Sequence, residues 1–424
     1  SVKHMERLIF HIDVNSAFLS WEAVRRVKQG LPDLREIPAC IGGDPKKRTG
    51  IVVAKSIPAK KYGIQTGEPM AMALRKCPNL TVVPGDFALF DQCSKAFKRI
   101  CASYAPVMES FSIDEVFLDM TGTSLIYPDP IATAHEIKDK IYKELGFTVN
   151  VGISTNKLLA KMASDFEKPD KVHTLFPDEI PIKMWPLPVR ELLFLGKVSE
   201  KKLVEAGIRT IGDLAHEREE RIQALLGEKA GHQLYGYARG IDDSPVRAQP
   251  EEAKGFSVET TFNDDIISME QILPVLLEQC DVLATRMRRK KKKCTCISVT
   301  FRTLDFKNRS HQTKLENPTD LTDEIYRNAK KLFGEFWKGQ PLRLIGVALT
   351  NLTEDGFEQL SLFEDTTDKE RHQKLDAAMD AIRSKYGNSM ITRASIMNSN
   401  ARIARKAKAQ MENERDRDVG KEIK

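Results

Sequence analysis

Two adjacent carboxylates interrupt an apolar, strand-like run at residues 109–120, which read ESFSIDEVFLDM. Successive side chains of a regular strand point to opposite faces of its sheet, so in an unbroken strand either Asp114 or Glu115 would meet the wrong environment. The chain therefore either turns at this point or places the pair beside a cation. Taken alone, two acids in a turn are more often a solvated hairpin tip than a functional site.

A third carboxylate, Asp13, ends another apolar run that begins at Leu8. A buried charge is costly without a partner, and divalent cations such as Mg²⁺ are the natural partners of clustered carboxylates. Two such ions about 4 Å apart would serve an in-line phosphoryl transfer. Lys60 and Lys168 fall where phosphates need a cation, although a solvated helix face for Lys60 and a favourable helix C-terminus for Lys168 explain them equally well.

The length of 424 residues predicts several domains, about three or four at roughly 100–200 residues each. Clustered prolines place one boundary near residue 175, and a polar stretch with two prolines at 242–254 marks a second. Between 255 and 352, alternating strands and two helices follow the order β-α-β-β-α-β, the split βαβ pattern. After Asn398 the chain is charged and nearly free of large apolar residues, which predicts a disordered tail.

Composition argues against several classes of protein. The net charge is only +6, from 66 Lys and Arg residues against 60 Asp and Glu residues, so affinity for a polyanion must come from local clusters. The seven cysteines have no paired CxxC spacing, which favours reduced thiols over disulfides or a zinc site. No segment approaches the roughly 18–20 apolar residues of a membrane span, and the N-terminus lacks a signal peptide's apolar core, so we expect a cytoplasmic protein.

Several short motifs together closely resemble the Y-family translesion DNA polymerases, in the DNA polymerase IV-like (DinB-type) branch of bacteria. The motifs are Asp13-Val-Asn-Ser-Ala-Phe18, Phe111-Ser-Ile-Asp-Glu115, Val151-Gly-Ile-Ser154 with Asn156-Lys157, Lys168-Pro169 and Ala238-Arg-Gly-Ile-Asp242. The resemblance runs from about residue 6 to residue 352. It implies an α+β multidomain protein, a right-handed polymerase with palm, small fingers, helical thumb with a helix-hairpin-helix, and ferredoxin-like little finger.

The resemblance also implies where each domain lies. We expect the palm at residues 1–16 and 86–174, the fingers at 17–85, the thumb at 175–243, a linker at 244–254, the little finger at 255–355, a clamp-binding peptide and C-terminal helix at 356–397, and a disordered tail at 398–424.

Carried over residue by residue, the resemblance implies a metal-dependent active site. Asp13, Asp114 and Glu115 would be the ligands of two Mg²⁺ ions, or Mn²⁺. The backbone carbonyl of Val14 would complete the coordination shell of one of these ions. Phe18 falls at the family's steric gate, where a ring under the sugar would clash with a 2′-hydroxyl. Without the resemblance, Phe18 is better explained as a core aromatic on an amphipathic helix.

The expected nucleotide contacts include one match and two departures from the family. Lys168 matches the lysine that binds the triphosphate. Lys60 stands where the family usually has arginine, and Ile57 where it usually has tyrosine. Lysine supplies charge without a bidentate fork, and isoleucine donates no hydroxyl hydrogen bond, so the phosphate and sugar contacts stay open.

Two regions are candidates for DNA contact. The segment 194–203 resembles half of a helix-hairpin-helix in which Phe194 replaces the first glycine, and it predicts contacts at Gly196, Lys197 and Val198. The basic run at 286–293 is either a solvated helix end or a phosphate-binding face beside an alternating strand. We favour the second interpretation, with contacts at Arg288, Arg289, Lys290, Ser298, Thr300 and Arg302 and a steep salt dependence of binding.

A short peptide near the C-terminus predicts a partner. The segment 359–363, QLSLF, resembles the bacterial sliding-clamp-binding peptide, and the alternative is a short strand of the little finger. Three apolar side chains would anchor it in a pocket and one amide would make a polar contact. These residues are Leu360, Leu362, Phe363 and Gln359.

These expectations together describe an enzyme. The resemblance implies a low-fidelity, template-directed DNA polymerase of the translesion type that transfers nucleotides from dNTP to a primer 3′-hydroxyl. Its partners would be primer-template DNA, dNTP and the sliding clamp, with no membrane, and we expect a monomer in the cytoplasm, associated with the nucleoid. Two alternatives stay open: a catalytically weak, clamp-recruited DNA-binding protein, and a palm-fold nucleotidyl cyclase.

Overall fold

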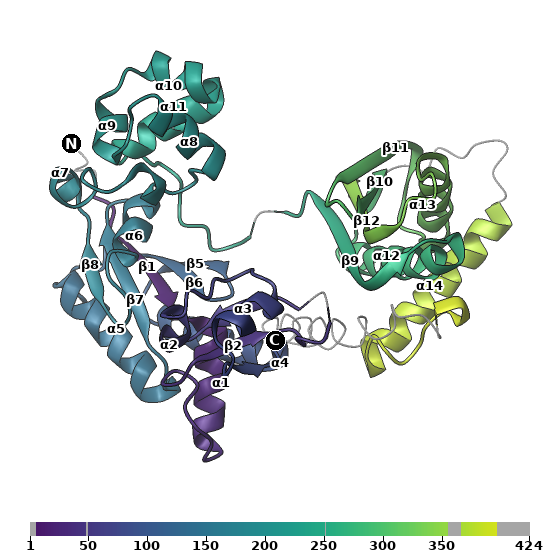
Figure 1. Ribbon diagram of the computed structural model, residues 1–424, viewed down its shortest axis with the longest axis horizontal. Coiled ribbons are helices and arrows are strands. Elements are labelled where there is room, and N and C mark those ends of the chain that lie inside the picture. Colours follow the sequence, from purple (N-terminus) through teal and green to yellow (C-terminus); the bar gives the residue numbers. More distant parts are fainter. Residues whose placement is uncertain (1–5, 48–49, 251, 355–365, 397–424) are drawn as a thin grey trace. The chain divides into compact units, whose positions relative to one another are not determined.

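The computed structural model describes residues 6–47, 50–250, 252–354 and 366–396 (Figure 1). The chain divides into two compact units, each described by itself below. The first comprises Ser1–Gly42 and Val52–Pro250, and the second comprises Glu251–Lys424 together with Gly43–Ile51. The predicted clamp-binding peptide at 359–363 and the predicted tail at 398–424 lie outside the described residues.

A five-stranded sheet in the order β5-β6-β1-β7-β8 forms the centre of the first unit. Strand β1 pairs antiparallel with both β6 and β7, and the β1–β6 register places Asp13 opposite Glu115. The two strands that carry the predicted acids are therefore direct neighbours. The strands are β1 (Ile9–Val14), β5 (Val107–Ser112), β6 (Glu115–Asp119), β7 (Val149–Ser154) and β8 (Val172–Thr174).

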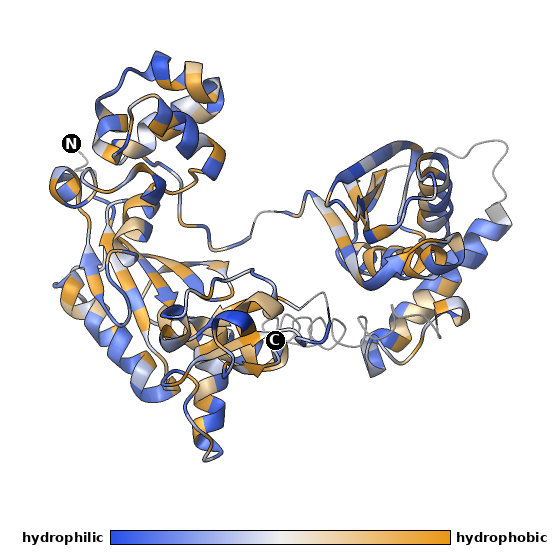
Figure 2. Ribbon diagram, viewed as in Figure 1, coloured by the Kyte–Doolittle hydropathy of each residue, from blue (hydrophilic) through white to orange (hydrophobic). Residues whose placement is uncertain are grey.

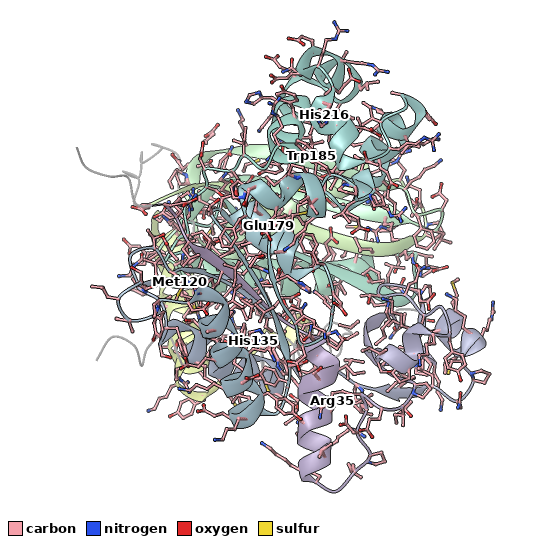
Figure 3. The ribbon with its side chains drawn as sticks, turned by 90° about the vertical axis from the view of Figure 1, so that its left-hand side faces the viewer. Arg35, Met120, His135, Glu179, Trp185 and His216 are labelled. Atoms are coloured by element: carbon pink, nitrogen blue, oxygen red, sulfur yellow. The ribbon has the colours of Figure 1, made fainter. Side chains whose placement is uncertain are left out.

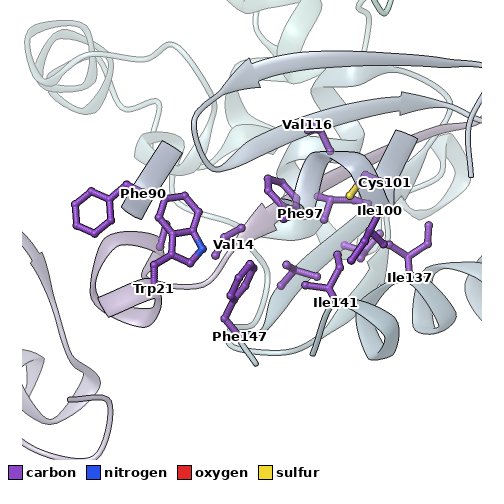
Figure 4. Packing of buried hydrophobic residues seen from close by; sticks show 14 of the residues in the cluster. Val14, Trp21, Phe90, Phe97, Ile100, Cys101, Val116, Ile137, Ile141 and Phe147 are labelled. Carbon is purple, nitrogen blue, oxygen red and sulfur yellow. The ribbon is translucent and has the colours of Figure 1, made fainter. Parts of the chain in front are cut away.

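Helices cover both faces of this sheet, and the side chains of β1 alternate between the two faces. Ile12 and Val14 lie in a large apolar core with side chains of α4 and α5 (Figure 4), whereas Ile9 packs against α6 on the other face. His11 and Asp13 share the face of Ile9, so they point toward α6. The helices are α1 (Ala17–Lys28), α4 (Phe87–Ala102), α5 (Pro130–Leu145) and α6 (Lys157–Ser164).

Hydropathy follows this layering. Figure 2 shows mostly hydrophobic colour along the strands of the sheet and mostly hydrophilic colour along α5, which covers the sheet from outside. Helix α1 belongs to the same core: Trp21 is fully buried, and its ring centroid lies 5.9 Å from Phe90 and 6.1 Å from Phe147. Burial of each phenylalanine ring contributes roughly 1.5–3 kcal/mol. The segment expected to begin the fingers at residue 17 thus starts with a helix of the sheet's own core.

A second, three-stranded sheet has the order β3-β2-β4, in which β2 and β3 pair antiparallel. The short helix α2 follows β3, and the Ser56 hydroxyl caps it by accepting a hydrogen bond from the Ala59 amide at 3.1 Å. These elements are β2 (Ala39–Gly42), β3 (Val52–Lys55), β4 (Thr81–Val83), α2 (Ile57–Lys60) and α3 (Met70–Lys76).

A helical region with its own core completes the first unit. Trp185 donates from Nε1 to the Ala238 carbonyl at 3.0 Å, and its ring lies edge-on to His216 with 4.6 Å between centroids (Figure 3). The helices are α7 (Ile180–Lys183), α8 (Lys197–Glu205), α9 (Ile211–His216), α10 (Glu219–Leu226) and α11 (Glu228–Ala238), with 3₁₀ turns η1 (Pro177–Glu179) and η2 (Val189–Glu191).

The first part of the predicted linker is bound to the sheet. The Arg247 amide donates to Glu109 Oε1 at 2.8 Å, and Lys157 holds the same carboxylate at 2.8 Å. Arg7 donates to the Ser244 carbonyl at 2.9 Å. Residues 244–247 therefore follow the surface of the five-stranded sheet, which the polar, Pro-containing sequence alone does not indicate.

The second unit has the predicted β-α-β-β-α-β order, in a four-stranded sheet arranged β11-β10-β12-β9. Helices α12 and α13 contact one face of this sheet, and alternation leaves the other face to polar and small side chains. The elements are β9 (Gly255–Ile266), α12 (Met269–Arg289), β10 (Lys293–Thr303), β11 (Asn308–Thr319), α13 (Thr322–Phe336), β12 (Leu342–Thr353), α14 (Thr366–Tyr386) and the 3₁₀ turn η3 (Ala394–Ile396).

Helix α14 docks on this unit through buried ion pairs. Arg383 Nη2 lies 2.8 Å from Asp281 Oδ2, and their side chains are 1% and 0% exposed. Asp376, 3% exposed, forms ion pairs with Arg393 at 3.0 Å and with Arg288 at 3.2 Å. Because ion pairs this deeply buried tolerate little rearrangement, α14 is an integral part of the unit.

Candidate active site

The turn between β5 and β6 answers the question that the adjacent acids raise. Strand β5 ends at Ser112 and β6 begins at Glu115, so Asp114 lies in the turn itself. The Val14 amide donates to the Asp114 carbonyl at 3.0 Å, which fixes this turn to the end of β1. The two carboxylates therefore lie at a hairpin rather than in an unbroken strand, with Asp114 in the turn and Glu115 as the first residue of β6.

A cleft of about 530 Å³ opens at this end of the sheet. It brings together six of the seven residues predicted for the metal and nucleotide site, from segments that lie far apart in the sequence. They are Asp13, Val14, Phe18, Lys60, Asp114 and Lys168. The cleft is also lined by Ile57, the residue that stands where the family usually has tyrosine, and by Lys55 and Thr66, which no sequence signal identified.

Lys168 faces the carboxylate of Asp13 across this cleft. Its ammonium forms ion pairs with Asp13 and, at 2.9 Å, with Asp165. Burial alone would lower the pKa of Lys168, but the charges and hydrogen bonds of Asp13 and Asp165 together outweigh burial and raise it. Helix α6 ends at Ser164, four residues earlier, so the explanation of Lys168 as a cation in the last helical turn is wrong.

Two asparagines position the loop that carries Lys168. The Asn15 side chain accepts a hydrogen bond from the Asp170 amide at 3.1 Å and donates to Asn150 Oδ1 at 3.1 Å. Asn150 in turn donates to the carbonyl of Ser164 at 2.9 Å and to that of Glu167 at 2.6 Å. This buried network ties the loop to β1 and β7, and it explains why an asparagine follows the end of the first strand.

Asp13 is mostly buried, with 14% of its side chain exposed. Burial raises the pKa of Asp13, the ion pair with Lys168 lowers it, and the charge of Asp114 raises it further, with a net upward shift. The upward effect of Asp114 shows that the two carboxylates repel each other. A bound cation would relieve that repulsion.

Glu115 is not among the residues that line the cleft, and one of its carboxylate oxygens is bound by residues of β1 and α6. Its Oε1 accepts hydrogen bonds from His11 Nε2 at 3.0 Å and from Lys161 Nζ. Burial alone would raise the pKa of Glu115, but the hydrogen bonds and charges of His11 and Lys161 together outweigh burial and hold the pKa well below its ordinary range. Glu115 is therefore a carboxylate, and sequence spacing did not identify either of its partners.

The donor atoms fit a hard divalent cation in type, because carboxylates and a backbone carbonyl are the ligands that Mg²⁺ prefers. Asp13 and Asp114 line one cleft and repel each other, which also fits a cation between them. No group of three or more His, Cys, Asp or Glu side chains within the described part of the chain is already arranged to hold a metal. Lysines pair with Asp13 and Glu115 instead.

The position of Phe18 supports its interpretation as a core aromatic, and the steric-gate role stays a prediction. Its half-buried ring packs 4.6 Å from Phe90 and 5.9 Å from Trp21, between centroids, and it also lines the cleft. Ser16, the residue before this helix, has φ 44°, and its side chain makes no capping hydrogen bond. A non-glycine residue in this left-handed region is strained, and such strain is common beside functional sites.

The predicted thumb contacts lie on an exposed surface. Gly196 precedes α8, and it is exposed together with Lys197 and Val198 at the start of that helix. A Cβ added to Gly196 would meet no atom within 4 Å, so packing inside the protein does not require glycine here. Phe194, at the position of the missing family glycine, has φ 66° and is 68% exposed.

The basic run at 286–293 needs a correction. Arg288 is 11% exposed and donates to Asp380 at 2.7 Å, to Asp376 at 3.2 Å and to the Asp320 carbonyl at 2.8 Å. It stabilises the docking of α14, so the prediction that it contributes to an exposed phosphate-binding face is wrong. Arg289 donates to Asn388 Oδ1 at 2.6 Å, and Lys290 is exposed.

The strand residues predicted with this run lie on the sheet face opposite the helices. Ser298 and Thr300 each place a hydroxyl 3.1 Å from Ser310 Oγ, and Arg302 donates to Asn308 at 2.7 Å. Their side chains alternate with the buried Val299 and Phe301. The predicted basic surface is thus divided between a helix end and this polar sheet face.

The cysteines and the helices bear on the expectations from composition. All seven cysteines are unpaired, and six of them are buried. None of the helices in the described ranges combines the length and apolar character that a membrane crossing requires.

Comparison with known proteins identifies relatives along most of the chain. The impB/mucB/samB family matches residues 12–165, its C-terminal domain matches 253–362, and the thumb domain of DNA polymerase-iota matches 194–242. DNA polymerase IV of Clostridium acetobutylicum is 46% identical over 394 residues, which is 93% of this chain and 99% of that protein. DNA polymerase IV 1 of Bacillus subtilis is 35% identical over 396 residues, 92% and 93% of the two chains.

A solved structure supports the fold. A Y-family DNA polymerase chimera of Dbh and Dpo4 superposes with a TM-score of 0.72 at 23% identity, covering 82% of this chain and all of that one. The fold and the site, together with these relatives, define a DNA-directed DNA polymerase. Among such enzymes, the chain belongs to the Y-family, the impB/mucB/samB family of translesion polymerases.

Proposed function

We propose that this polymerase joins a primer 3′-hydroxyl to the α-phosphate of an incoming dNTP selected by the template. The oxygen–phosphorus bond to the primer forms, the bond to the β-phosphate breaks, and pyrophosphate leaves with the proton of the hydroxyl released. The observation that carries the proposal is the cleft in which Asp13, Asp114 and Lys168 meet. As in a translesion polymerase, we expect synthesis across damaged templates with low fidelity.

The residues at and beside the cleft have separate roles in this reaction. Asp13, Asp114 and Glu115, with the Val14 carbonyl, would hold two Mg²⁺ ions, or Mn²⁺, which when bound would supply the positive charge that activates the hydroxyl and stabilises the leaving phosphates. The ion pair between Lys168 and Asp13 must break before Asp13 can bind a metal ion. The triphosphate of the dNTP then gives the Lys168 ammonium a new anionic partner. No residue of the cleft is required as a general base in this scheme.

The walls of the cleft select the nucleotide. Phe18 would sit under the sugar and exclude a 2′-hydroxyl, because its ring is held by Phe90 and Trp21 and cannot retreat without disturbing the core. Lys60 would add charge near the phosphates, without the bidentate geometry of arginine. Ile57, 53% exposed, offers the sugar only an apolar contact.

Primer extension tests the proposed chemistry. With Mg²⁺ and an undamaged template, the parent protein should add dNTPs in the template's order and use rNTPs poorly. Phe18→Ala should improve rNTP use while dNTP addition continues. Addition that ignores the template, or equal use of dNTPs and rNTPs by the parent, would contradict the proposal.

DNA contact is proposed on two surfaces. The amides around Gly196, with Lys197 and Val198, would hold backbone phosphates at the start of α8. On the second unit, the polar sheet face and the basic helix end would do the same, through Arg289, Lys290, Ser298, Thr300 and Arg302. Primer-template affinity should fall steeply from low to moderate salt concentration. In a plot of the logarithm of affinity against the logarithm of salt concentration, Lys197→Ala should reduce the slope by about one phosphate contact.

The peptide at 359–363 is proposed to recruit the polymerase to the sliding clamp through Leu360, Leu362, Phe363 and Gln359. The matched test compares the parent with Leu362→Ala plus Phe363→Ala on clamp-loaded and bare templates. Only the clamp-dependent stimulation should be lost. We propose that the enzyme acts as a monomer in the cytoplasm, at the nucleoid.

The two alternative functions explain less of the structure. A nucleotidyl cyclase would share the acids but has no use for the β-α-β-β-α-β unit. A DNA-binding protein without turnover has no need to retain all three carboxylates together with a lysine that faces them. Binding of primer-template without any nucleotide addition in Mg²⁺ or Mn²⁺ would favour that second alternative.

A further inference from the structure

Two donors converge on one oxygen of Glu115, at the back of the proposed metal site. His11 is 1% exposed, and because a carboxylate only accepts, its Nε2 donates to Oε1 at 3.0 Å. The other ring nitrogen lies 2.7 Å from Ser164 Oγ in α6, which fixes the ring plane. Lys161, one turn earlier in α6, donates its Nζ proton to the same Oε1.

The second oxygen of Glu115 has a different environment. Its Oε2 lies 2.9 Å from Ser112 Oγ, and the same hydroxyl lies 2.8 Å from Asp114 Oδ1. A serine hydroxyl carries one proton, so it donates to only one of these two anionic oxygens at a time. Glu115 Oε2 and Asp114 Oδ1 therefore share one proton, whereas Glu115 Oε1 has two donors of its own.

We infer that Lys161 and His11 are positioning residues: they occupy Oε1 of Glu115 and leave Oε2, beside Asp114, as the oxygen that faces the catalytic cation. Without them, the Glu115 carboxylate would be free to turn about its last bond or to present both oxygens. Neighbours of metal ligands that fix orientation in this way typically account for 10–100-fold in metal affinity or activity. This inference rests on the proposed function, because it assigns a role within the same metal site.

The two lysines near the site have different surroundings. Lys168 is 39% exposed, lines the cleft and pairs with Asp13, so an entering triphosphate can take over its ammonium. Lys161 is 19% exposed, pairs with Glu115, and its ammonium lies 5.0 Å from the Phe111 ring centroid. Among the residues that line the cleft, Lys168 is present and Lys161 is not. Lys161 should thus stay with Glu115 through the reaction while Lys168 moves to phosphate.

The test measures metal affinity without turnover. The full-length protein, a dideoxy-terminated primer-template and the matching dNTP are titrated with Mn²⁺, and free Mn²⁺ is followed by electron paramagnetic resonance. Lys161→Met should weaken Mn²⁺ binding at least ten-fold, and Lys161→Arg should restore most of it. In single-nucleotide kinetics, Lys161→Met should lower kcat with little change in the KM for dNTP, whereas Lys168→Met should chiefly raise that KM.

Two further measurements keep the outcomes distinct. If Lys161→Met lowers the melting temperature by more than a few degrees, the titration is done with Lys161→Gln instead. This variant keeps a neutral hydrogen-bond donor and should bind Mn²⁺ with intermediate affinity. Unchanged Mn²⁺ affinity in a folded Lys161→Met variant of an active parent overturns the inference and leaves the proposed function standing. An inactive parent whose Mn²⁺ binding is unaffected by Asp114→Ala overturns the proposed function itself.

Discussion

The buried pair of Arg383 and Asp281 should decide whether α14 stays docked. Replacing Arg383 with methionine keeps much of the side-chain volume and leaves the fully buried Asp281 without its main partner. Breaking a buried ion pair from one side typically costs about 3–5 kcal/mol. Arg393 Nε remains 3.7 Å from Asp281, so we expect the lower end, about 3 kcal/mol. Because 1.4 kcal/mol changes an equilibrium constant tenfold, the equilibrium constant for undocking of α14 should rise roughly 150-fold.

Hydrogen exchange measures that opening directly. Peptides from α14 in the full-length Arg383→Met variant should exchange faster by about two decades, while peptides from the five-stranded sheet keep their rates. Arg371→Met is the matched control, since Arg371 lies on the same helix and is exposed. A second change, Asp281→Asn, should recover part of the loss by removing the buried charge. Equal α14 exchange in Arg383→Met and Arg371→Met would refute this reasoning.

Three further predictions concern the sheet, the site and the thumb. Gly152→Ala should unfold at least 5 °C earlier in a melting scan, because the new Cβ would lie 1.9 Å from the Ala160 carbonyl oxygen and must displace α6; an unchanged melting temperature would contradict the packing described. The pKa of Glu115 is held below its unfolded value near 4.5, so its carboxylate stabilises the fold above that pH and loses this effect as pH falls further. Glu115→Gln should therefore melt below the parent at pH 7, with a gap that narrows under pH 4.5, and a constant gap would count against the two hydrogen bonds. Phe194→Gly should keep or raise the melting temperature, since it removes a left-handed phenylalanine, and a lower melting temperature would show that the exposed ring is needed for packing.

The features that the sequence predicted well are those set by local pattern. Strict alternation along residues 255–352 predicted the order of the second unit. The Asp114-Glu115 pair predicted either a turn or a nearby cation, and the structure shows the turn. The family resemblance then linked Asp13, Asp114 and Lys168, which the structure gathers at one cleft. Sequence spacing alone did not decide whether Lys168 binds phosphate or stabilises the end of a helix.

The features that the sequence did not predict depend on contacts between distant segments. Lys161 and His11 meet at Glu115 only because α6 covers one face of β1, and 150 residues separate the two partners in the chain. Arg288 resembles a DNA contact within its basic run, yet it is neutralised by Asp376 and Asp380, about 90 residues later. A charge run therefore predicts a basic surface only if no acidic element packs against it.

The central claim is that the cleft of Asp13, Asp114 and Lys168 transfers nucleotides to a primer. The most direct measurement is single-nucleotide addition to a primer-template in Mg²⁺ by the parent, by Asp114→Ala, and by Asp178→Ala as a control at an exposed carboxylate outside the cleft. We predict template-directed addition by the parent and by Asp178→Ala, and none above background for Asp114→Ala, with all three proteins melting within a few degrees of one another. Undiminished addition by a folded Asp114→Ala variant would contradict the account.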